Sequence, residues 1–360
     1  MEFRSGVRRR LAPIAFILAL TLGAGGTAAF AADQATIDAA KKEGALVYAT
    51  NLFAPTTQKE LQKAFRDFYK LPDSFKMQGY IGSSSSVVSR TTQELQANKV
   101  TVDWLAVNFA TFWKNLQKRG ELMKYCSSEY KGLTYRKKAG VLDGGCNFQA
   151  VAIITFGLMW NPAYVKEDLQ SWAQLTNPKY KGQIIFGDVR KSAAYLDAYY
   201  GLRKNKVWTD TWLEKIKAQK PFFLLRSTDI RDRVMSGEFP IAILGYGPRA
   251  YQVRKQAKLD VSWPKEGVVE DGNYGGILAK APHPNAAKLW NDFIFSKKGQ
   301  EILIKLEAIA TLRSDVSIPS EVKPFVPDLG KVKALSVDWS TLTKAQLDPM
   351  RADFRKFFGQ

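Results

Sequence analysis

The sequence predicts an α/β protein in two lobes, with mainly parallel sheets flanked by helices. Short apolar runs that suit buried strands alternate with segments of helical periodicity over most of the chain. This alternation is typical of strand–helix units, in which helices cover a largely parallel sheet. The 360 residues also exceed what one hydrophobic core usually organises. We therefore expect two lobes of ordinary domain size.

The N-terminus predicts a secretory signal over residues 1–31. Three arginines, Arg8 to Arg10, precede an apolar stretch from Leu11 to Leu22, and an Ala-Phe-Ala pattern ends at Ala31. The apolar stretch is shorter than the roughly 20 residues that span a bilayer. No cysteine stands at the cleavage site, so we expect a free periplasmic protein without a lipid anchor. Whether export follows the general or the twin-arginine route stays open.

The first part of the chain predicts alternating helices and strands. A helix over residues 35–42 is expected to end at Gly44, because glycine is common just past a helix. Thr57 and Glu60 have the spacing of a capping box, which predicts a helix from there to about residue 69. The other elements expected here are strands at 45–50 and 103–107, a helix opening at 82–86 and a helix at 112–123.

The middle of the chain repeats this order and then returns to the first lobe. A β-rich run over 150–159 is expected to be the first crossing strand, and residues 264–266 to mark the return. Between them we expect helices at 171–175, 193–202 and 228–236, and strands at 183–186, 221–225 and 240–245. The first lobe is predicted to comprise residues 32–150 and 267–310, and the second lobe 151–266 and 311–360.

Two helices are expected in succession after residue 284, with Asn285 able to cap the first and Ser296 starting the second. Leu289, Phe293 and Ile294 give the first of them a buried stripe, and Ile302 and Leu306 are expected to face inward in the second. A final helix over 344–358 is expected to pack on the second lobe.

The two cysteines, Cys126 and Cys146, predict a disulfide. The predicted compartment is oxidising and the count is even. Closing a loop of this length contributes about 3 kcal/mol in the chain-entropy model. The spacing is not C-x-x-C, so we expect a structural bond and not a redox centre.

The chain is strongly basic, with a formal net charge of +19. Removing residues 1–31 takes away four arginines and one glutamate, which leaves 49 basic and 33 acidic side chains and a net charge of +16. Such a balance can indicate nucleic acid, an anionic membrane surface or small anionic ligands. The charges are scattered and no nucleic-acid motif is present, so we expect no nucleic-acid partner.

Two stretches carry a resemblance to a known family. Residues 156–188 contain FGLMWNPAYV and SWAQLTNPKYKGQIIFGD, and residues 279–303 read AKAPHPNAAKLWNDFIFSKKGQEIL. Both resemble the extracellular solute-binding proteins of ABC importers, in the two-lobed type II group that includes ferric-ion and phosphonate binders. The resemblance implies a ligand cleft between the lobes, no cofactor, a monomer and delivery of a small ligand to an inner-membrane permease.

The candidate ligand-binding residues follow predicted strands, where α/β ligand sites gather. The strongest candidate is the serine loop after Gly82, because a helix start with hydroxyl groups favours an anion; a serine-containing loop lines the cleft in the resembled family. Arginine adds paired donors for carboxylate or phosphate. The full set comprises Asn51, Ser83, Ser84, Ser85, Ser86, Asn108, Arg190, Ser192, Tyr246 and Arg249. Each also has a structural interpretation, as a cap, a turn or a surface charge. The predicted ligand is a small carboxylate, phosphonate or phosphate ester.

Ferric iron remains an alternative ligand. The ferric-binding members place two adjacent tyrosines where this chain has Tyr246 followed by glycine, and a carboxylate where it has Asn108. The only histidine, His283, precedes a predicted helix away from the cleft. Tyr195, Tyr199 and Tyr200 could still supply phenolates, and we expect no direct metal site.

Two other functions are alternatives for an exported protein of this fold class. A binding protein that serves a sensor instead of an importer would use the same site. An enzyme is disfavoured, because the sequence contains no G-x-S-x-G, H-E-x-x-H or P-loop motif.

Overall fold

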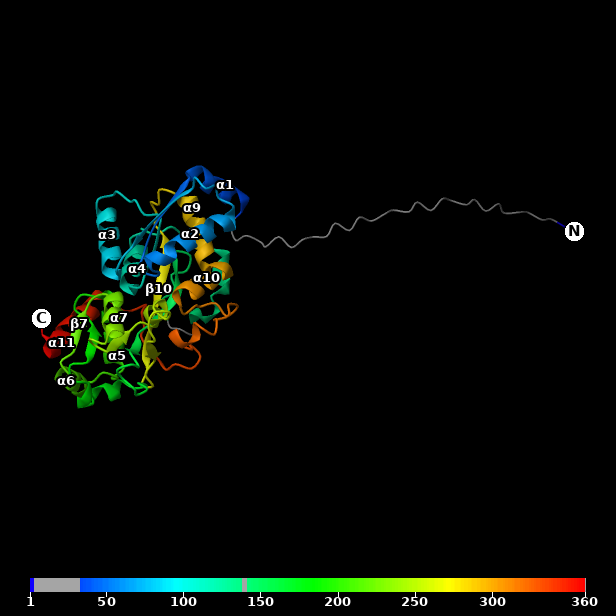
Figure 1. Ribbon diagram of the computed structural model, residues 1–360. Helices are drawn as coiled ribbons and strands as arrows, with labels where there is room; N and C mark the ends of the chain where they lie inside the picture. The colour runs from blue at the N-terminus through cyan, green and yellow to red at the C-terminus, as the bar shows by residue number, and fades with distance from the viewer. Residues whose placement is uncertain (3–32, 138–140, 360) are drawn as a thin grey trace. The chain divides into compact units, whose positions relative to one another are not determined.

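The computed structural model describes residues 1–2, 33–137 and 141–359. The predicted secretory signal therefore lies outside the described residues, apart from its first two positions. Residues 31–360 form one compact unit, coloured from blue to red in Figure 1. None of the described helices is both long and apolar enough to cross a membrane.

The first sheet combines parallel strands with long antiparallel ones. β1 pairs in parallel with β2 and β3, while β10 runs antiparallel to both β3 and β4. β11 pairs in parallel with the start of β10. The strands are β1 (Ala45–Thr50), β2 (Lys76–Ile81), β3 (Trp104–Val107), β4 (Phe148–Thr155), β10 (Val268–Ile277) and β11 (Ala334–Leu335).

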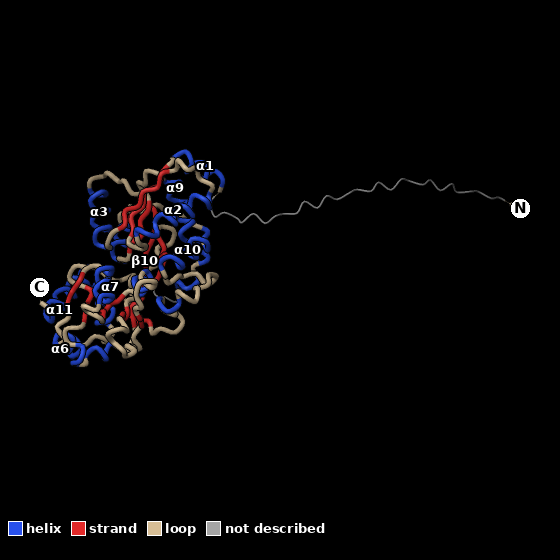
Figure 2. The backbone as a smooth tube through the Cα atoms, in the orientation of Figure 1, coloured by secondary structure: helices blue, strands red, loops and turns tan. Residues whose placement is uncertain are grey.

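The second sheet has the order β7-β6-β8-β5-β9. β6 pairs in parallel with β7 and β8, and β5 runs antiparallel to β8 and β9. Its strands are β5 (Gly157–Trp160), β6 (Ile184–Gly187), β7 (Phe222–Leu224), β8 (Ile241–Gly245) and β9 (Asp260–Ser262). Figure 2 shows the two groups of strands with helices around each.

The helices of the first lobe are α1 (Gln34–Glu43), α2 (Pro55–Tyr69), α3 (Ser84–Gln96), α4 (Ala110–Lys118), α9 (Pro284–Phe295) and α10 (Lys297–Glu307). Those that accompany the second sheet are α5 (Ala193–Lys204), α6 (Asp210–Ala218), α7 (Ser227–Ser236), α8 (Gly247–Gln252) and α11 (Lys344–Phe358). Short 3-10 turns lie at Ser128–Gly132, Thr134–Lys137, Trp172–Thr176, Pro178–Tyr180 and Lys323–Phe325. The last helix packs on α5 and α6.

The chain passes between the sheets at residue 156 and again over residues 263–267. The sequence predicted one strand over 150–159, and this was wrong, because Phe156 separates β4 of the first sheet from β5 of the second. β4 pairs with β10 through Thr155. The change of sheet thus falls five residues later than the predicted lobe boundary at 150.

Aromatic packing explains why α9 covers the first sheet. Trp290 is fully buried, stacks on Tyr48 of β1 with ring centroids 4.9 Å apart, and meets Phe65 of α2 edge to face. Such aromatic pairs add about 0.5–1.5 kcal/mol beyond the burial of their area. The inward face of α10 is formed by fully buried Leu303 and Ile304, whereas the predicted Ile302 and Leu306 are only partly buried.

The start of α2 corrects one sequence prediction. The predicted capping box at Thr57 and Glu60 is absent, and α2 begins at Pro55 after Ala54, which has no side-chain cap. The buried carboxylate of Glu307, at the end of α10, accepts hydrogen bonds from the Ala54 N–H, at 2.8 Å, and from the Thr57 hydroxyl. A side chain 250 residues away thus replaces the local cap.

Asn285 also lies elsewhere than expected. It stands one residue inside α9, where its backbone N–H and side-chain amide both donate to the carboxylate of Glu43, and His283 is the N-cap residue. The imidazole of His283 lies 3.0 Å from Asp103, away from any strand end that faces the cleft.

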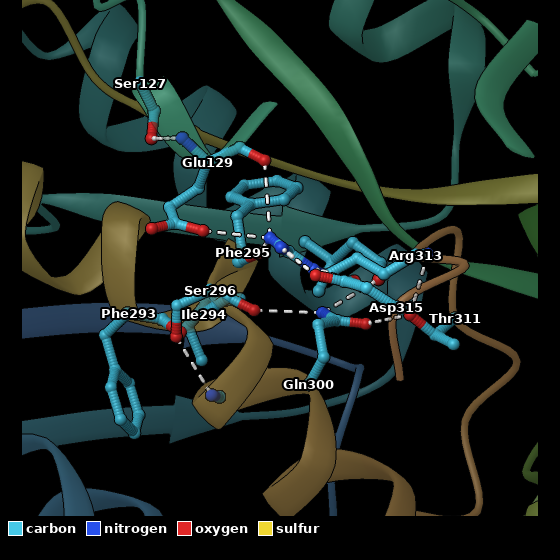
Figure 3. A network of polar contacts seen from close by, with 12 residues as sticks. Ser127, Glu129, Phe293, Ile294, Phe295, Ser296, Gln300, Thr311, Arg313 and Asp315 are labelled. Atoms are coloured by element: carbon cyan, nitrogen blue, oxygen red, sulfur yellow. Dashed lines mark hydrogen bonds and ion pairs between the residues drawn. The ribbon is translucent and has the colours of Figure 1, made fainter. Parts of the chain in front are cut away.

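A buried arginine fixes the segment that follows α10 (Figure 3). The Arg313 guanidinium donates to the carboxylates of Glu129 and Asp315, at 2.9 and 2.8 Å, and to the Phe295 carbonyl at 2.9 Å. Only 8% of its side chain is exposed. Gly132 leaves room for this side chain, since a Cβ there would come within 2.4 Å of the guanidinium carbon.

The predicted disulfide between Cys126 and Cys146 is present. It joins the segment after α4 to the start of β4, next to the backbone hydrogen bond from Tyr125 to the Cys146 carbonyl, at 2.7 Å. This position supports a structural role.

The capping box of the chain lies at α11. The Thr343 side chain accepts from the backbone three residues on, and the Gln346 side chain accepts from the Thr343 N–H at 2.9 Å. We expect Thr343→Ala to lower the free energy of unfolding by about 1 kcal/mol. Urea unfolding followed by circular dichroism measures this difference. Thr341→Ala serves as the control, and an equal loss there would contradict the assignment to the cap.

Candidate functional site

A cavity of about 450 Å³ lies at the carboxyl ends of the parallel strands of both sheets. This volume lies within the usual range for small-molecule sites. Its described lining comprises Asn51, Phe53, Ala54, Pro55, Ile81, Gly82, Ser83, Ser84, Ser86, Asn108, Ile154, Phe156, Ser192, Ala194, Tyr195, Leu225, Arg226, Ser227, Thr228, Tyr246, Arg249 and Asn273.

The first-lobe wall is a network of three amides and a hydroxyl. Asn51 follows β1, and its Nδ2 donates to Ser84 Oγ at 2.8 Å and to Asn108 Oδ1 at 2.5 Å. Asn273, on β10, donates from Nδ2 to Asn51 Oδ1 at 2.8 Å. Asn108 and Asn273 are only 2% and 1% exposed. The network therefore holds these side chains in one arrangement at the strand ends.

The start of α3 forms the adjoining part of this wall. Ser83 is the N-cap residue, and its Oγ accepts from the Ser86 N–H at 3.2 Å. Gly82 allows the close approach of this side chain, since a Cβ at residue 82 would come within 2.4 Å of Ser86 Oγ. The first turn of the helix, with its unpaired N–H groups, is thereby brought to the cavity.

Arg249 forms the charged part of the second-lobe wall. Its Nε donates to Ser227 Oγ at 3.1 Å, and its Nη1 lies 4.0 Å from the Glu307 carboxylate. Its side chain is 12% exposed, and its guanidinium carbon lies 5.7 Å from the centre of the Tyr246 ring. The guanidinium is thus held against the cavity with donors to spare.

Three aromatic rings lie between the two walls. Phe156, at the crossing, contacts Tyr195 of α5 and Tyr246, with centroids 5.1 and 5.6 Å apart. The Tyr195 hydroxyl is buried and has no hydrogen-bond partner among the described residues. Burial raises the pKa of both phenols, and the nearby Arg249 charge opposes the rise. Both tyrosines are therefore neutral donors at physiological pH.

The electrostatics of the cavity favour negative charge. The first turns of α3, α5 and α7 contribute lining residues, so the positive ends of these helix dipoles converge on the cavity. The first turn of α2 also lines it, but its amino end is already capped by the Glu307 carboxylate. Arg226 and Arg249 add two cations, and none of the described lining residues is acidic. Within the described part of the chain, no group of three or more His, Cys, Asp or Glu side chains could hold a metal ion.

The cavity brings together eight of the ten predicted residues: Asn51, Ser83, Ser84, Ser86, Asn108, Ser192, Tyr246 and Arg249. Ser192 is the N-cap residue of α5. Ser85 lies outside the lining, and its Oγ donates instead to the Lys191 carbonyl at 3.2 Å, across the mouth of the cleft.

Arg190 also lies outside the lining. Its Nε and Nη2 donate to the Asp188 carboxylate at 2.8 and 3.0 Å, and its guanidinium lies over the Phe223 ring. These contacts match the structural interpretation of Arg190, in which its charge is paired within the protein. In the sequence, an arginine and a lysine after a strand are compatible with ligand binding and with a structural ion pair. The sequence does not separate these two roles, because the acid that pairs with the arginine lies only two residues away in the same loop.

The sequence missed Asn273, Ser227 and Phe156 and suggested Tyr195 only as a ferric ligand. Asn273 lies within β10, whose polar and glycine-rich sequence VVEDGNYGGI gave no strand signal. Tyr199 and Tyr200, the other suggested phenolates, are not in the lining, and Tyr199 donates to Asp353 at 2.6 Å.

Comparisons with known proteins agree with this architecture. The structure with a TM-score of 0.74 is a substrate-binding protein of an ABC transporter from Agrobacterium tumefaciens, 14% identical over 87% of this chain and 94% of that one. The periplasmic binding protein AfuA from Actinobacillus pleuropneumoniae, solved with fructose-6-phosphate, has a TM-score of 0.70 and 20% identity over 87% and 98%. Iron-bound HitA from Pseudomonas aeruginosa has a TM-score of 0.66 and 19% identity over 88% and 99%. These likenesses show the two-lobed fold.

A family model and a sequence relative match most of the chain. An uncharacterized protein of Haemophilus influenzae is 26% identical over 335 residues, which cover 87% of this chain and 90% of the relative. The family model for bacterial extracellular solute-binding proteins matches residues 109–337, more than half of the chain. The chain therefore belongs to the bacterial extracellular solute-binding proteins, whose two-lobed fold it shares.

Proposed function

We propose that this protein captures a small organic anion in the cavity between its lobes and delivers it to the permease of an ABC importer. One observation carries the proposal: helix amino ends and two arginines converge on a cavity whose described lining contains no carboxylate. Fixed dipoles and cations of this kind stabilise a negative ligand where water is partly excluded. Carboxylates, phosphonates and phosphate esters all have the required charge.

The arrangement also explains how binding would favour closure. The amides and the start of α3 come from the first lobe, whereas Arg249, Ser227 and Tyr195 come from the second. A ligand that contacts both walls stabilises the closed arrangement, because the open form lacks half of these contacts. The permease then distinguishes loaded from empty protein. We further propose a monomer, exported by residues 1–31, with a binding and not a catalytic role.

Ferric iron is the second candidate, because the phenols of Tyr195 and Tyr246 line the same cavity. A hard ferric ion prefers ionised oxygen ligands. Burial raises the pKa of both phenols and so opposes their ionisation. Iron would need a synergistic anion to supply the missing negative charge.

A melting screen of the chain without residues 1–31 tests the function. A specific ligand raises the melting temperature as its concentration rises through the Kd. We expect shifts with glycerol 3-phosphate, glycerate or a phosphonate, and none with neutral sugars or amines. Ferric citrate and citrate alone form a separate pair. If only amines or neutral sugars stabilise the protein, the proposal is wrong; if ferric citrate alone does, the second candidate replaces it.

A further inference from the structure

Besides the Tyr195 hydroxyl, one more buried polar atom of a lining residue has no partner among the described residues. Asn273 is 1% exposed and lines the cavity, and its Oδ1 accepts no hydrogen bond from the described residues. A buried acceptor of this kind costs roughly 1–3 kcal/mol when it stays unpaired. If the ligand of a binding protein donates a hydrogen bond to this oxygen, the cost is removed when the ligand binds.

The neighbouring amides limit what the ligand must offer. Both N–H groups of Asn51 are used, on Ser84 and Asn108, and its Oδ1 is used by Asn273. Asn108 Oδ1 already accepts twice, from Asn51 and from the Ser84 hydroxyl at 2.8 Å. Its Nδ2 has no acceptor among the described residues. Among the described residues, the network therefore leaves one acceptor unpaired, on Asn273, and one donor group unpaired, on Asn108, and both residues line the cavity.

This inventory does not depend on the direction in which the amides are placed. Turning the three amides over together reverses every hydrogen bond between them and exchanges the free acceptor and the free donor. One of each is still left without a partner among the described residues. The register that pairs Tyr274 with Val107 makes Asn273 and Asn108 neighbours across strands β10 and β3. An acceptor on one neighbour and a donor on the other complement a hydroxyl group, which donates one hydrogen bond and accepts others. An ionised oxygen only accepts, so it would leave the acceptor unpaired and be repelled by it.

The charge of the ligand belongs at the opposite wall. Arg249 lies there with the unpartnered Tyr195 hydroxyl, and the Arg249 charge is close enough to affect the pKa of that phenol. The first turn of α7, with Ser227, adjoins both. All of these groups donate, and none of them needs a donor from the ligand.

We propose that the ligand is a hydroxylated organic anion, whose negative group faces Arg249 and Tyr195 and whose hydroxyl group pairs with the amides of Asn108 and Asn273. The inference rests on the proposed function, because it assigns a charged end and a hydroxylated end to the ligand of the same cavity. It covers hydroxylated phosphate esters and hydroxy acids, which share the chemistry. Inorganic anions and simple alkyl anions lack the second end.

Matched ligands test this without any substitution. Isothermal titration calorimetry compares glycerol 3-phosphate with propyl phosphate, and glycerate with propionate, on the chain without residues 1–31. We expect the hydroxylated member of at least one pair to bind about tenfold or more tightly, since the alkyl member leaves a buried acceptor unpaired. The pair that responds identifies the source of the charge. Equal or tighter binding of the alkyl member in both pairs overturns the inference.

Substitutions then identify the side chains that cause the preference for the hydroxylated ligand. Asn273→Leu removes the acceptor at nearly constant volume, and we expect it to reduce the preference for the hydroxylated member to about twofold or less. Asn108→Ala tests the donor in the same way if the first variant does not fold. Asn115→Leu, on the exposed face of α4, is the matched control and should keep the preference. Retained preference in both Asn273→Leu and Asn108→Ala contradicts the assignment.

Different results would contradict the proposed function and the hydroxylated ligand. If no anion of either pair binds and the screen also finds none, the proposed function is wrong. If anions bind but hydroxyl groups make no difference, only the present inference is wrong.

Discussion

Arg249→Ala is expected to weaken binding of the tightest anion in the melting screen by about 100-fold, which corresponds to about 2.7 kcal/mol. The variant loses a largely buried cation that lies against the cavity and holds Ser227. It also leaves the Glu307 carboxylate, only 1% exposed, without its nearest cation. A ligand anion held by Arg249 would form a desolvated charge pair with it, and removing one member of such a pair typically costs 2–5 kcal/mol or more of binding free energy. Titration calorimetry at fixed ionic strength measures the change.

Two arginine variants provide controls of equal charge. Arg254→Ala removes a guanidinium that stacks on Tyr251 just after α8, outside the cavity lining. Arg190→Ala removes one that is paired with Asp188. Both should bind within about twofold of the unchanged protein, with circular dichroism confirming the fold. A fall of less than about threefold in Arg249→Ala would remove this residue from the site.

The stability of the protein is expected to fall as the pH rises from about 4 to about 7. Burial raises the pKa of Asp271, on β10, to about 7, and it also raises the pKa of Asp197, on α5. The Asp271 charge further raises the pKa of Asp197, while the Arg351 charge lowers it. Hydrogen bonds from Gly272 and Tyr274 oppose the rise in the pKa of Asp271. Asp271 Oδ2 and both carboxyl oxygens of Asp197 accept no hydrogen bond from the described residues.

The sign follows from proton binding. Between these pH values the native Asp271 still holds a proton that the unfolded chain has released, so unfolding becomes more favourable as the pH rises. The stabilisation is complete below the unfolded pKa near 4 and is lost by the native value of about 7. A shift of this size corresponds to an effect on the order of 4 kcal/mol.

Asp271→Asn tests this prediction. Asparagine keeps an acceptor for the Gly272 N–H and the Tyr274 hydroxyl and cannot ionise. We expect it to raise the free energy of unfolding at pH 8, to change it little at pH 4.5, and to flatten the profile between them in urea titrations. Asp73→Asn, at an exposed loop position, should leave the profile unchanged. A wild-type stability that rises with pH across this range contradicts the prediction.

The sequence predicted accurately the helices and strands whose hydrophobic pattern and flanking turn residues lie close together in the chain. The apolar run of β1 and the helix α11 were predicted with their observed bounds, and the strand after Pro240 differs by one residue. These segments have clear periodicity or turn residues on both sides. The serine loop and the strand ends also led to eight of the residues that line the cavity, because ligand sites of α/β folds gather at the carboxyl edge of a parallel sheet.

The missed features depend on contacts between distant segments. All ten residues of β10 are buried, although its sequence includes Glu270, Asp271 and Asn273, because β10 lies between β3 and β4. Gly275 in this strand allows close packing, since a Cβ would come within 2.6 Å of the Trp104 ring. No local pattern reveals such a strand, and Asn273 was missed for the same reason. The capping of α2 by Glu307 is equally invisible in the nearby sequence.

The position of β10 has a consequence for the order in which the chain can fold. β3 and β4 both need β10 as their neighbour, and β10 begins only at residue 268. The sheet formed by residues 157–262, in contrast, is continuous along the chain. When the chain becomes available for folding from its amino end, we expect this later sheet to form first. β3 and β4 then lack a neighbouring strand until β10, more than 100 residues further along the chain, is also available.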